Sequence, residues 1–513
     1  MKKTLASVLA VAALVATMAG CSSSGSSSTA PAASKTPTAA SNTPAASSSA
    51  SVEESAEPAE LSLCMSQIRW GISVDDGHMQ KWVEELQNAT NTKIEMIAPT
   101  HNDYMEKLNV LLASGDTPDI MIPQQAWDYV GQFAVRGYIQ PLTEYINNDA
   151  RFAAVKGFDT SIYQSGDDIY GIPLGSGNSK VFWFRNDLVE KYGLNISETM
   201  TTDDFITELK KVDKSEAIPF SFPKHIVNFQ IFYNAFGAYG GILQDENGVY
   251  YDGIQTQEMK DAFAFIKTLY DEGLMDSEFI TNENSNMLEK IYAGKTVSDV
   301  DYTSRYINYL QSSASVEAAT DFTPVYSLVG PNGDKGTLNE SGNEAVCISV
   351  DCPDVDAALN LIHHLFFTEE GRMLYTIGIE GVHYDIVDNV LTPKEDAVAA
   401  GYAVGLSDLI GGWAAVDVSK LGFTFADTKN EDITKNMEVT SKANIDYVGP
   451  LVKIPMGKST LYDENVATYN SNLYEMATKI VLGSQTIEEA YADYEQFWKS
   501  IQGDKMLDEL NGK

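Results

Sequence analysis

Cysteine is scarce in this chain, with four residues among 513: Cys21, Cys64, Cys347 and Cys352. Their spacing fits neither a disulfide scaffold nor a paired CxxC zinc motif. Cys347 and Cys352 flank a strand-like apolar stretch, and the sequence leaves open whether they pair. An HExxH motif is also absent, although His363 and His364 are adjacent. We therefore predict no disulfide framework and no metal site.

Basic residues are few as well. The chain has 35 lysines and arginines against 72 aspartates and glutamates, a formal net charge of −37. Such a surface repels nucleic acid and anionic lipid over a large area. The charge therefore argues against a nucleic-acid partner, and an acidic surface of this kind is typical of solubility outside the cell.

The common motifs of catalysis are missing. The chain has no GxSxG elbow, no Walker loop and no GxGxxG after a strand. The glycine-rich stretch 175–178 precedes the strand-like VFWF instead of a helix that would hold phosphate. Seventy-two carboxylates make a glycosidase pair easy to imagine, but local context singles none of them out. We predict a protein without a cofactor that is not an enzyme, with a carbohydrate-active surface hydrolase as the alternative.

Long apolar runs are confined to the amino terminus. Lys2 and Lys3 precede an uncharged stretch from Thr4 to Gly20, which is short for a membrane span and well shaped for a secretory signal over 1–20. Met18-Ala19-Gly20-Cys21 resembles the lipobox of bacterial lipoproteins. This resemblance implies cleavage before Cys21, acylation of its thiol, and a lipid anchor on the outer face of the cell membrane.

A serine-, alanine- and proline-rich stretch follows the cysteine. It holds almost no large apolar residue as far as about residue 60. Such a segment cannot bury enough surface to offset its ordering entropy. We predict a disordered tether over 21–61 that links the anchor to a folded body.

The body alternates strand-like and helix-like segments. Strands are predicted at 67–74, 91–99 and 117–124, with amphipathic helices at 78–91 and 103–116 between them. This order indicates βαβ units, hence a parallel sheet with helices on its faces. Small ligands of such sheets usually bind in the loops at the carboxyl ends of the strands.

A hairpin is predicted farther along the chain. Asn247-Gly248 lies between two potential strands in DENGVYYDG, residues 245–253. The acidic residues of this stretch lack the spacing of an EF-hand loop. A surface turn is therefore the prediction, in preference to a calcium site.

Several segments together resemble one known family. TPDIMIPQQAWDYVGQFAVRGYIQPLTEYI (117–146), GDDIYGIPLGSGNSKVFWFRNDLVEKYGL (166–194) and the block at 341–386 ending in GIEGVHYDI resemble, in order, the extracellular solute-binding proteins of ABC importers, family 1. The block at 341–386 resembles the lipoprotein branch associated mostly with carbohydrate uptake. The matching segments span nearly the whole body.

The resemblance implies an α/β fold with two lobes of the periplasmic-binding-protein type II kind, hinge crossovers and a ligand cleft between the lobes. The segment 171–184 resembles the first crossover and 319–330 the second. The expected N-lobe covers 62–178 and 322–375, and the expected C-lobe covers 179–321 and 376–513.

The same resemblance implies a monomeric lipoprotein that captures a carbohydrate, expected to be an oligosaccharide, and delivers it to ABC permease subunits. A peptide-binding lipoprotein is a further alternative. Sugar rings need flat aromatic faces, and sugar hydroxyls need planar polar groups. Trp82 and Trp498 on helical stripes, and Trp70 in a strand, are assigned to the core instead. The candidate ligand-binding residues are Asp75, Asp76, Gln124, Gln125, Trp127, Asp301, Tyr302, Arg305 and Trp413.

Overall fold

The computed structural model describes residues 57–66, 72–100, 103–124, 126–157, 160–174, 179–224, 229–314, 320–337, 344–404, 418–426, 428–446, 454 and 457–513. The predicted signal peptide, Cys21 and the tether up to residue 56 lie outside these ranges. Within them, no helix combines the length and the apolar character that a membrane span requires.

The first sheet has five strands in the order β2-β1-β3-β15-β6. β1 runs parallel to both β2 and β3, whereas β15 is antiparallel to β3 and to β6. The predicted parallel sheet is therefore present, and β15 is its antiparallel strand, because β6, antiparallel to β15, runs in the same direction as β1, β2 and β3. Its strands are β1 (Ala59–Cys64), β2 (Thr92–Ile97), β3 (Ile120–Met121), β6 (Ile172–Pro173) and β15 (Ala345–Ile348).

The first strand begins earlier than the sequence predicted. Residues 72–74 of the predicted strand 67–74 form no strand, and residues 67–71 lie outside the described ranges. The strand is Ala59–Cys64 instead, and its residues 59–61 had been assigned to the tether. Leu61, Leu63 and Cys64 are buried in the first core. Burial of these apolar side chains stabilises the strand, whereas the polar residues before it have little apolar surface to bury.

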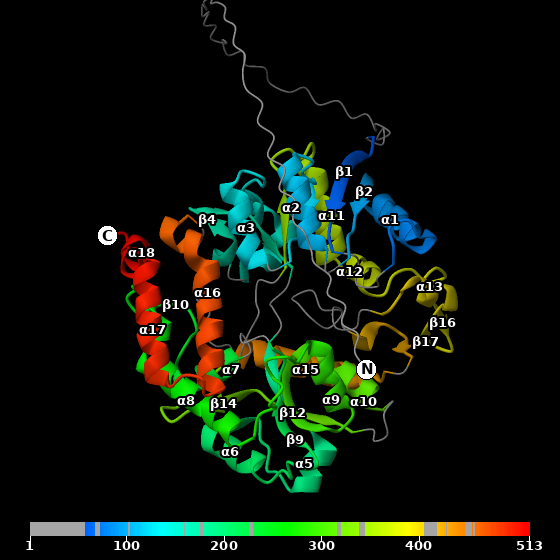
Figure 1. The fold of residues 1–513 in the computed structure, drawn as a ribbon. Helices are drawn as coiled ribbons and strands as arrows, with labels where there is room; N and C mark the ends of the chain where they lie inside the picture. Colours follow the sequence, from blue (N-terminus) through cyan, green and yellow to red (C-terminus); the bar gives the residue numbers. More distant parts are fainter. Residues whose placement is uncertain are drawn as a thin grey trace, which may run out of the picture. The chain divides into compact units, whose positions relative to one another are not determined.

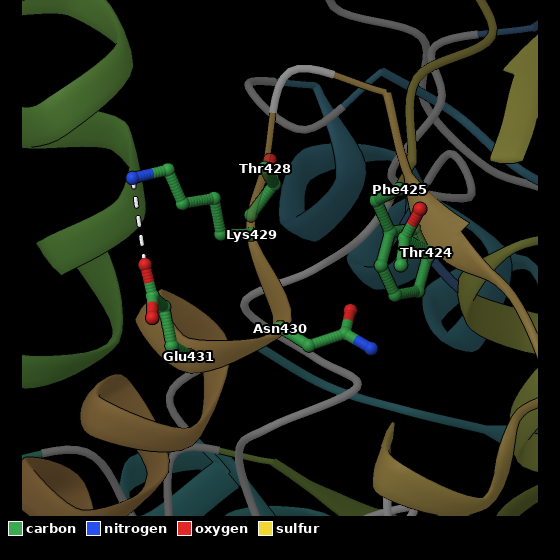
Figure 2. A pocket seen from close by; sticks show the side chains of 6 residues that line it. All are labelled: Thr424, Phe425, Thr428, Lys429, Asn430 and Glu431. Carbon is green, nitrogen blue, oxygen red and sulfur yellow. Dashed lines mark ion pairs between the residues drawn. The ribbon is translucent and has the colours of Figure 1, made fainter.

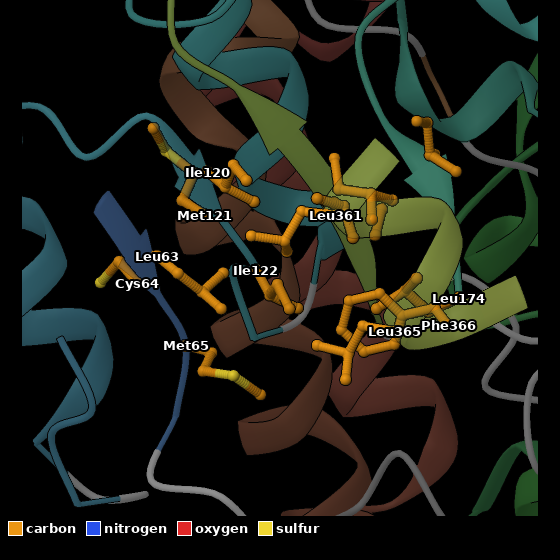
Figure 3. Close-up of a cluster of buried hydrophobic side chains, with 14 of the residues drawn as sticks. Leu63, Cys64, Met65, Ile120, Met121, Ile122, Leu174, Leu361, Leu365 and Phe366 are labelled. Atoms are coloured by element: carbon orange, nitrogen blue, oxygen red, sulfur yellow. The ribbon is translucent and has the colours of Figure 1, made fainter. Parts of the chain in front are cut away.

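Helices cover the first sheet, as the alternating pattern predicted. Figure 3 shows Leu63, Ile120 and Met121 of the strands with Leu361 and Leu365 of α11 in one buried cluster. Trp82 is fully buried, and its indole N–H donates to the carbonyl of Leu374 at 2.8 Å, which confirms its assignment to the core. The helices of this region are α1 (Gly77–Thr90), α2 (Tyr104–Ser114), α3 (Ala126–Val135), α4 (Thr143–Asn148), α11 (Val355–Phe367), α12 (Glu369–Thr376) and α13 (Glu395–Ala400).

The second sheet has four strands in the order β13-β7-β12-β9. β7 (Lys180–Arg185) is antiparallel to β12 (Thr296–Tyr302) and to β13 (Phe322–Val325), and β9 (Ile218–Ser221) is parallel to β12. Phe182, Phe205, Phe220 and Phe232 pack together in a second core, separate from the first. Figure 1 shows β9 and β12 close to α5, α6, α9 and α10.

The last three helices of the second region, α16, α17 and α18, follow one another at the carboxyl terminus. Trp498 is 4% exposed and stacks on Tyr494, so its assignment to the core is confirmed as well. The helices are α5 (Asn186–Tyr192), α6 (Thr202–Leu209), α7 (Gln230–Tyr233), α8 (Gln257–Asp271), α9 (Asn284–Tyr292), α10 (Tyr306–Ala314), α15 (Asn430–Asp446), α16 (Thr460–Val481), α17 (Ile487–Ser500) and α18 (Gly503–Leu510).

Small sheets and hairpins complete the described structure. The predicted hairpin is confirmed, because β10 and β11 pair antiparallel and the Asp245 carboxylate accepts from the backbone N–H groups of Asn247 and Val249. The remaining strands are β4 (Gln164–Ser165), β5 (Asp168–Ile169), β8 (Thr199–Thr201), β10 (Ile242–Gln244), β11 (Tyr250–Asp252), β14 (Ser327–Val329), β16 (Tyr384–Val387), β17 (Val390–Pro393) and β18 (Thr424–Phe425).

Between elements that the structure describes, three connections, or passages, join the region of the first sheet to the region of the second. The first passage joins β6 to β7, as predicted from 171–184. The second lies between β14 and β15, later than the predicted segment 319–330, because β13 and β14 still pair with β7 and β8. The third joins β18 to α15. The predicted lobe boundaries remain a prediction, although Tyr384, Leu391 and Phe425 are buried in the first core.

Candidate functional site

The ends of the first two passages lie together at one edge of the first sheet. Gln124, just after β3, forms an antiparallel bridge with Glu344, just before β15. The N–H of Leu174, just after β6, donates to the carbonyl of Glu344 at 3.1 Å. Gln124 is half-buried here, so one of the predicted site residues stands where the chain leaves and re-enters the first sheet.

The other ends of the same passages meet at the second sheet. Lys180 opens β7 and pairs in register with Tyr302 at the end of β12. The hydroxyl of Thr337, near the second passage, donates to the carbonyl of Lys180. The N–H of Thr303 donates to the carbonyl of Ser179 at 2.9 Å. These bonds fix the end of β12 beside the first two passages.

Three of the predicted site residues gather at this end of β12. Tyr302 is half-buried, and its ring lies 4.5 Å from the Lys180 ammonium and 5.9 Å from the Arg305 guanidinium carbon. Arg305, in the short helix η6 (Thr303–Arg305), places Nε 3.2 Å from Oδ2 of Asp301. Its side chain is 33% exposed, whereas that of Asp301 is 3% exposed. An aromatic face and a planar donor thus stand together with partial access to solvent.

Two carboxyl groups lie behind this cluster. Asp299 and Asp301 are two residues apart on β12, so their side chains point to the same face. The hydroxyl of Tyr309 donates to Oδ2 of Asp299 at 2.6 Å. Burial raises the pKa of Asp299 well above its ordinary value, and the charge of Asp301 raises it further. Burial also raises the pKa of Asp301, while the opposite charge of Arg305 lowers it. Asp301 thus pairs with the guanidinium, whereas Asp299 accepts from the Tyr309 hydroxyl.

An aromatic pair that the sequence analysis did not identify supports the same turn. Trp183 of β7 stacks on Tyr306 at 5.6 Å between ring centroids, and its indole N–H donates to the carbonyl of Tyr302 at 3.2 Å. Both rings are buried. The indole of Trp183 thus fixes the backbone of Tyr302, whose side chain is half-buried.

A hollow of about 650 Å³ lies at the third passage. Thr424 and Phe425 of β18 line one side, and Thr428, Lys429, Asn430 and Glu431 line the other (Figure 2). The amide of Gln311 in α10 donates to the Thr428 hydroxyl at 2.7 Å. The amide of Asn436, farther along α15, donates to the carbonyl of Thr303 at 2.7 Å. The hollow is thereby connected, through α10 and α15, to the segment that carries Arg305.

Asp75 and Asp76 have a local role in the structure. Asp75 lies in a turn that no described strand precedes directly, and Asp76 is the N-cap of α1. Its carboxylate accepts from the His78 backbone N–H at 2.8 Å and lies 2.7 Å from Nδ1 of the same residue. These hydrogen bonds hold the pKa of Asp76 below its ordinary value. The predicted position after a strand is wrong for this pair, and a ligand role for them stays a prediction.

Other predicted residues cannot be placed in the site. Gln125 and Trp413 lie outside the described residues, as does Trp70. Trp127 lies on α3, and its side chain is outside the described part of the chain. In the ranges that the structure covers, no group of three or more histidine, cysteine, aspartate or glutamate side chains is arranged to hold a metal ion. Cys64, Cys347 and Cys352 carry free thiols.

The chain is similar to several proteins of known name. Lipoprotein LipO of Bacillus subtilis (strain 168) is 24% identical over 461 residues, which cover 84% of this chain and 88% of LipO. The fructooligosaccharide ABC transporter substrate-binding protein FusA of Streptococcus pneumoniae serotype 4 is 26% identical over 302 residues, which cover 53% of this chain and 54% of FusA.

Solved structures show the same fold. The structure of FusA in complex with kestose superposes with a TM-score of 0.61 at 17% identity, covering 88% of this chain and 98% of that one. The alginate-binding protein AlgQ2 without calcium ion gives a TM-score of 0.64 at 19% identity, covering 88% and 97%. The predicted two-lobed α/β fold of periplasmic binding proteins is thus confirmed.

The family assignment rests on a match that spans more than half of the chain. Residues 73–371 match the family described as bacterial extracellular solute-binding protein, which confirms the resemblance inferred from the motifs. The chain belongs to the family of bacterial extracellular solute-binding proteins.

Proposed function

We propose that the protein captures a carbohydrate, in the form of an oligosaccharide, outside the cell and delivers it to the permease of an ABC importer. It does so as a monomer tethered by a lipid on Cys21, and it is not an enzyme. The observation that carries the carbohydrate assignment is the half-buried ring of Tyr302, which stands beside Arg305 and Lys180 at the passage between the two sheets.

The chemistry of this cluster suits a sugar. The face of a tyrosine ring packs against the C–H groups of a sugar ring, and a guanidinium donates several hydrogen bonds to hydroxyl oxygens in one plane. Asp301 holds Arg305 from the buried side, so less side-chain entropy is lost when a ligand binds. The names of relatives agree with this class of ligand, since FusA is called a fructooligosaccharide ABC transporter substrate-binding protein and AlgQ2 an alginate-binding protein.

The position of the cluster suits a protein that closes around its ligand. A ligand that contacts groups on both sides of the passages binds the closed state better than the open one, and it shifts the population by that difference in affinity. Gln124, Gln125 and Trp127 on the side of the first sheet, Tyr302 and Arg305 on the side of the second, and Asp75, Asp76 and Trp413 are the residues proposed to make these contacts. A permease could then distinguish loaded protein from empty protein.

A thermal-shift screen tests the ligand class. The purified mature body is melted alone and with kestose, nystose, malto-oligosaccharides, alginate oligosaccharides and a set of short peptides. A glycan at a hundred times its dissociation constant adds about 2.7 kcal/mol to the free energy of unfolding and raises the melting temperature. Stabilisation by peptides alone contradicts the carbohydrate assignment. Release of shorter products from a stabilising glycan moves the protein to the class of surface hydrolases.

A second experiment tests the anchor. Cells producing the wild-type chain or Cys21→Ala are labelled with a fatty acid and fractionated. The wild-type protein is expected to carry label and to sediment with membranes, and Cys21→Ala to lose both properties, because two or more acyl chains make a stable anchor. Equal membrane association of the two proteins contradicts the lipoprotein assignment.

A further inference from the structure

Two carboxyl groups are buried two residues apart on one face of β12. Asp299 and Asp301 pair in register with Trp183 and Val181 of β7. Among the described residues, Oδ1 of Asp299 has no hydrogen-bond partner, and Arg305 is the one basic residue that forms an ion pair with either carboxyl group. Burying a charge costs free energy unless the charge is paired. Two buried carboxylates beside one guanidinium are therefore unfavourable, and this arrangement favours uptake of a proton.

The hydroxyl of Tyr309 connects the two carboxyl groups. It donates to Oδ2 of Asp299 at 2.6 Å and lies 3.5 Å from Oδ2 of Asp301. A hydroxyl carries one proton and can donate it to one carboxylate at a time. The protonation of Asp299 therefore affects the hydrogen bonding that is available to Asp301, and the two groups titrate as a coupled pair.

Both oxygens of Asp301 face N–H groups of the proposed ligand contacts. Oδ1 accepts from the backbone N–H of Tyr302 at 2.8 Å, and Oδ2 lies 3.2 Å from Nε of Arg305. A carboxylate only accepts, whereas a neutral carboxyl group carries a proton on one oxygen and no longer attracts the guanidinium by charge. Uptake of a proton by Asp301 therefore weakens its bond to Arg305, to Tyr302 or to both.

Arg305 is open to a ligand, whereas Asp301 is not. The side chain of Arg305 is 33% exposed and that of Asp301 is 3% exposed. A guanidinium has five N–H donors, so those that do not face Asp301 remain for the hydroxyl oxygens of a sugar. Asp301 can thus affect a ligand through the two residues that it holds, without touching the ligand itself.

Charged and titratable groups face the carboxyl pair from each neighbouring element. Burial raises the pKa of Asp301 above its ordinary value and outweighs the opposing charges of Arg305 and Lys180. Burial also raises the pKa of Tyr292 and of Tyr309, so both stay neutral as the pH falls. The two carboxyl groups are thus the members of this cluster that take up protons in acid. The groups that face them are Tyr292 of α9, Tyr309 of α10, Lys180 of β7, Arg305 of η6 and Tyr302 at the end of β12.

We infer that Asp301 is a positioning residue that couples ligand binding to protons: its carboxylate holds Arg305 and Tyr302 in the arrangement that binds a sugar, and uptake of a proton at Asp301 weakens binding. The inference rests on the proposed carbohydrate function. The affinity for a neutral sugar therefore falls as the pH falls. By reciprocity, ligand binding favours the ionised form of Asp301 and releases protons to the solvent.

Calorimetric titration at several pH values tests this coupling. The titrants are kestose, nystose and maltotetraose, neutral sugars without a group that titrates between about pH 4.5 and about pH 8, so any pH dependence belongs to the protein. The wild-type affinity should fall about tenfold from the upper to the lower end of this range. Asp301→Asn lacks the charge, so it is expected to bind about tenfold more weakly than the wild type at about pH 8 and to show no pH dependence. The matched control is Asp149→Asn, which removes the charge that pairs with Arg151 in the region of the first sheet.

Two buffers with different enthalpies of ionisation report the released protons directly. Near the middle of the wild-type pH profile, the apparent binding enthalpy should differ between the two buffers, because the buffer takes up the protons that binding releases. Asp301→Asn should give the same enthalpy in both. A melting curve of each protein at each pH shows that it is folded, so that unfolding is not mistaken for a loss of affinity.

Three results overturn the inference while leaving the proposed function intact. They are a wild-type affinity that does not change with pH, an Asp301→Asn that keeps the wild-type affinity or its pH dependence, and an Asp149→Asn that loses the pH dependence. If none of these sugars binds the wild-type protein at any pH, the assignment to a neutral carbohydrate itself fails.

A second variant serves if Asp301→Asn does not fold. Tyr309→Phe removes a hydroxyl that lowers the pKa of Asp301, so the affinity should begin to fall at a higher pH than in the wild type. At about pH 8 its affinity should stay within about twofold of the wild-type value. A pH profile that does not shift overturns the inference.

Discussion

The interiors of the two sheets differ in chemistry. In the first sheet, β1 and β15 bury leucine, isoleucine, valine and cysteine, and polar groups such as Ser62 and Asp119 stay half-buried near the strand ends. In the second sheet, β12 buries Thr296, Ser298, Asp299 and Asp301, all 2% exposed or less. Burying such groups costs free energy unless they are hydrogen-bonded.

This difference coincides with the place of the proposed ligand contacts. An apolar sheet needs only volume and pattern to be stable. The acidic groups of β12 stand behind Tyr302 and Arg305, at the edge where two passages meet. Protein interiors are usually apolar, and exceptions are expected at functional sites. The buried polar residues of β12 are such an exception. The first sheet then serves as the scaffold, and the end of β12 holds the predicted contacts.

The largest effect is expected from a cavity in the apolar sheet. Leu63→Ala removes a fully buried side chain packed between strands and α11, and it should lower the free energy of unfolding by roughly 2–5 kcal/mol. Urea unfolding measures the loss. Val110→Ala is the control, because Val110 is 55% exposed and its replacement should change little. Similar losses from both variants would contradict the view that the first sheet is held by apolar packing.

A buried histidine in the first region should make the free energy of unfolding depend on pH. His383 is fully buried, and burial lowers its pKa to about 4. The unfolded chain therefore binds more protons than the folded one between pH 6.5 and 4, so stability falls as the pH falls through this window, by at most about 3 kcal/mol. His383→Gln should flatten that part of the curve, measured by urea unfolding at several pH values. Equal pH dependence of the two proteins would contradict the lowered pKa of His383.

Several charged groups near His383 also affect the pH dependence of stability. The ring of His78 lies 6.0 Å from that of His383, and the charges of His78 and Lys81 lower its pKa further. Asp76 and Asp396 face His78 from α1 and α13. Hydrogen bonds hold the pKa of Asp76 and of Asp396 below the ordinary value, and both carboxylates still bind protons at acid pH. The difference between variant and wild type therefore isolates the histidine, and neither curve alone does.

A smaller effect is expected from the polar strand. Tyr309→Phe removes the hydroxyl that donates to Asp299, and the described residues offer no partner to the other oxygen of that carboxyl. The loss should be roughly 1–3 kcal/mol, the cost of an unsatisfied buried group. Asp299→Asn keeps the shape and one acceptor oxygen, and burial raises the pKa of Asp299 in the direction of the neutral form, so this change should alter the free energy of unfolding by less than about 1 kcal/mol. A larger loss of stability from Asp299→Asn than from Tyr309→Phe would show that Asp299 is charged in the folded protein.

The βαβ arrangement and the hairpin at 245–253 were predicted from local patterns of apolar and turn residues. The family and the first passage were predicted from the resemblance of several segments to known motifs. The first strand was misplaced, since AELSLC is too short to stand out beside a tether of low complexity. The second passage was placed too early, because strand pairing of β13 and β14 is set by partners far away in the chain.

The candidate site was predicted in part. Asp301, Tyr302 and Arg305 were found because a charged and aromatic group follows an apolar stretch, and the structure brings them together. Lys180 was missed, although its place directly after the glycine-rich crossover was a usable indication. Trp183 and Tyr306 could not be paired from sequence, and nothing in TFADTKNED distinguishes the hollow from an ordinary loop.

The central claim is that the end of β12 binds a sugar, and the most direct test is calorimetric titration of Tyr302→Ala. The titrant is the glycan that gives the largest shift in the thermal screen, and Tyr474→Ala, a 40% exposed tyrosine on α16, is the control. Loss of a ring that is buried on binding should weaken the affinity of Tyr302→Ala by roughly 1–3 kcal/mol, about 5- to 150-fold, with Tyr474→Ala unchanged. An affinity of Tyr302→Ala equal to that of the wild type would contradict the claim.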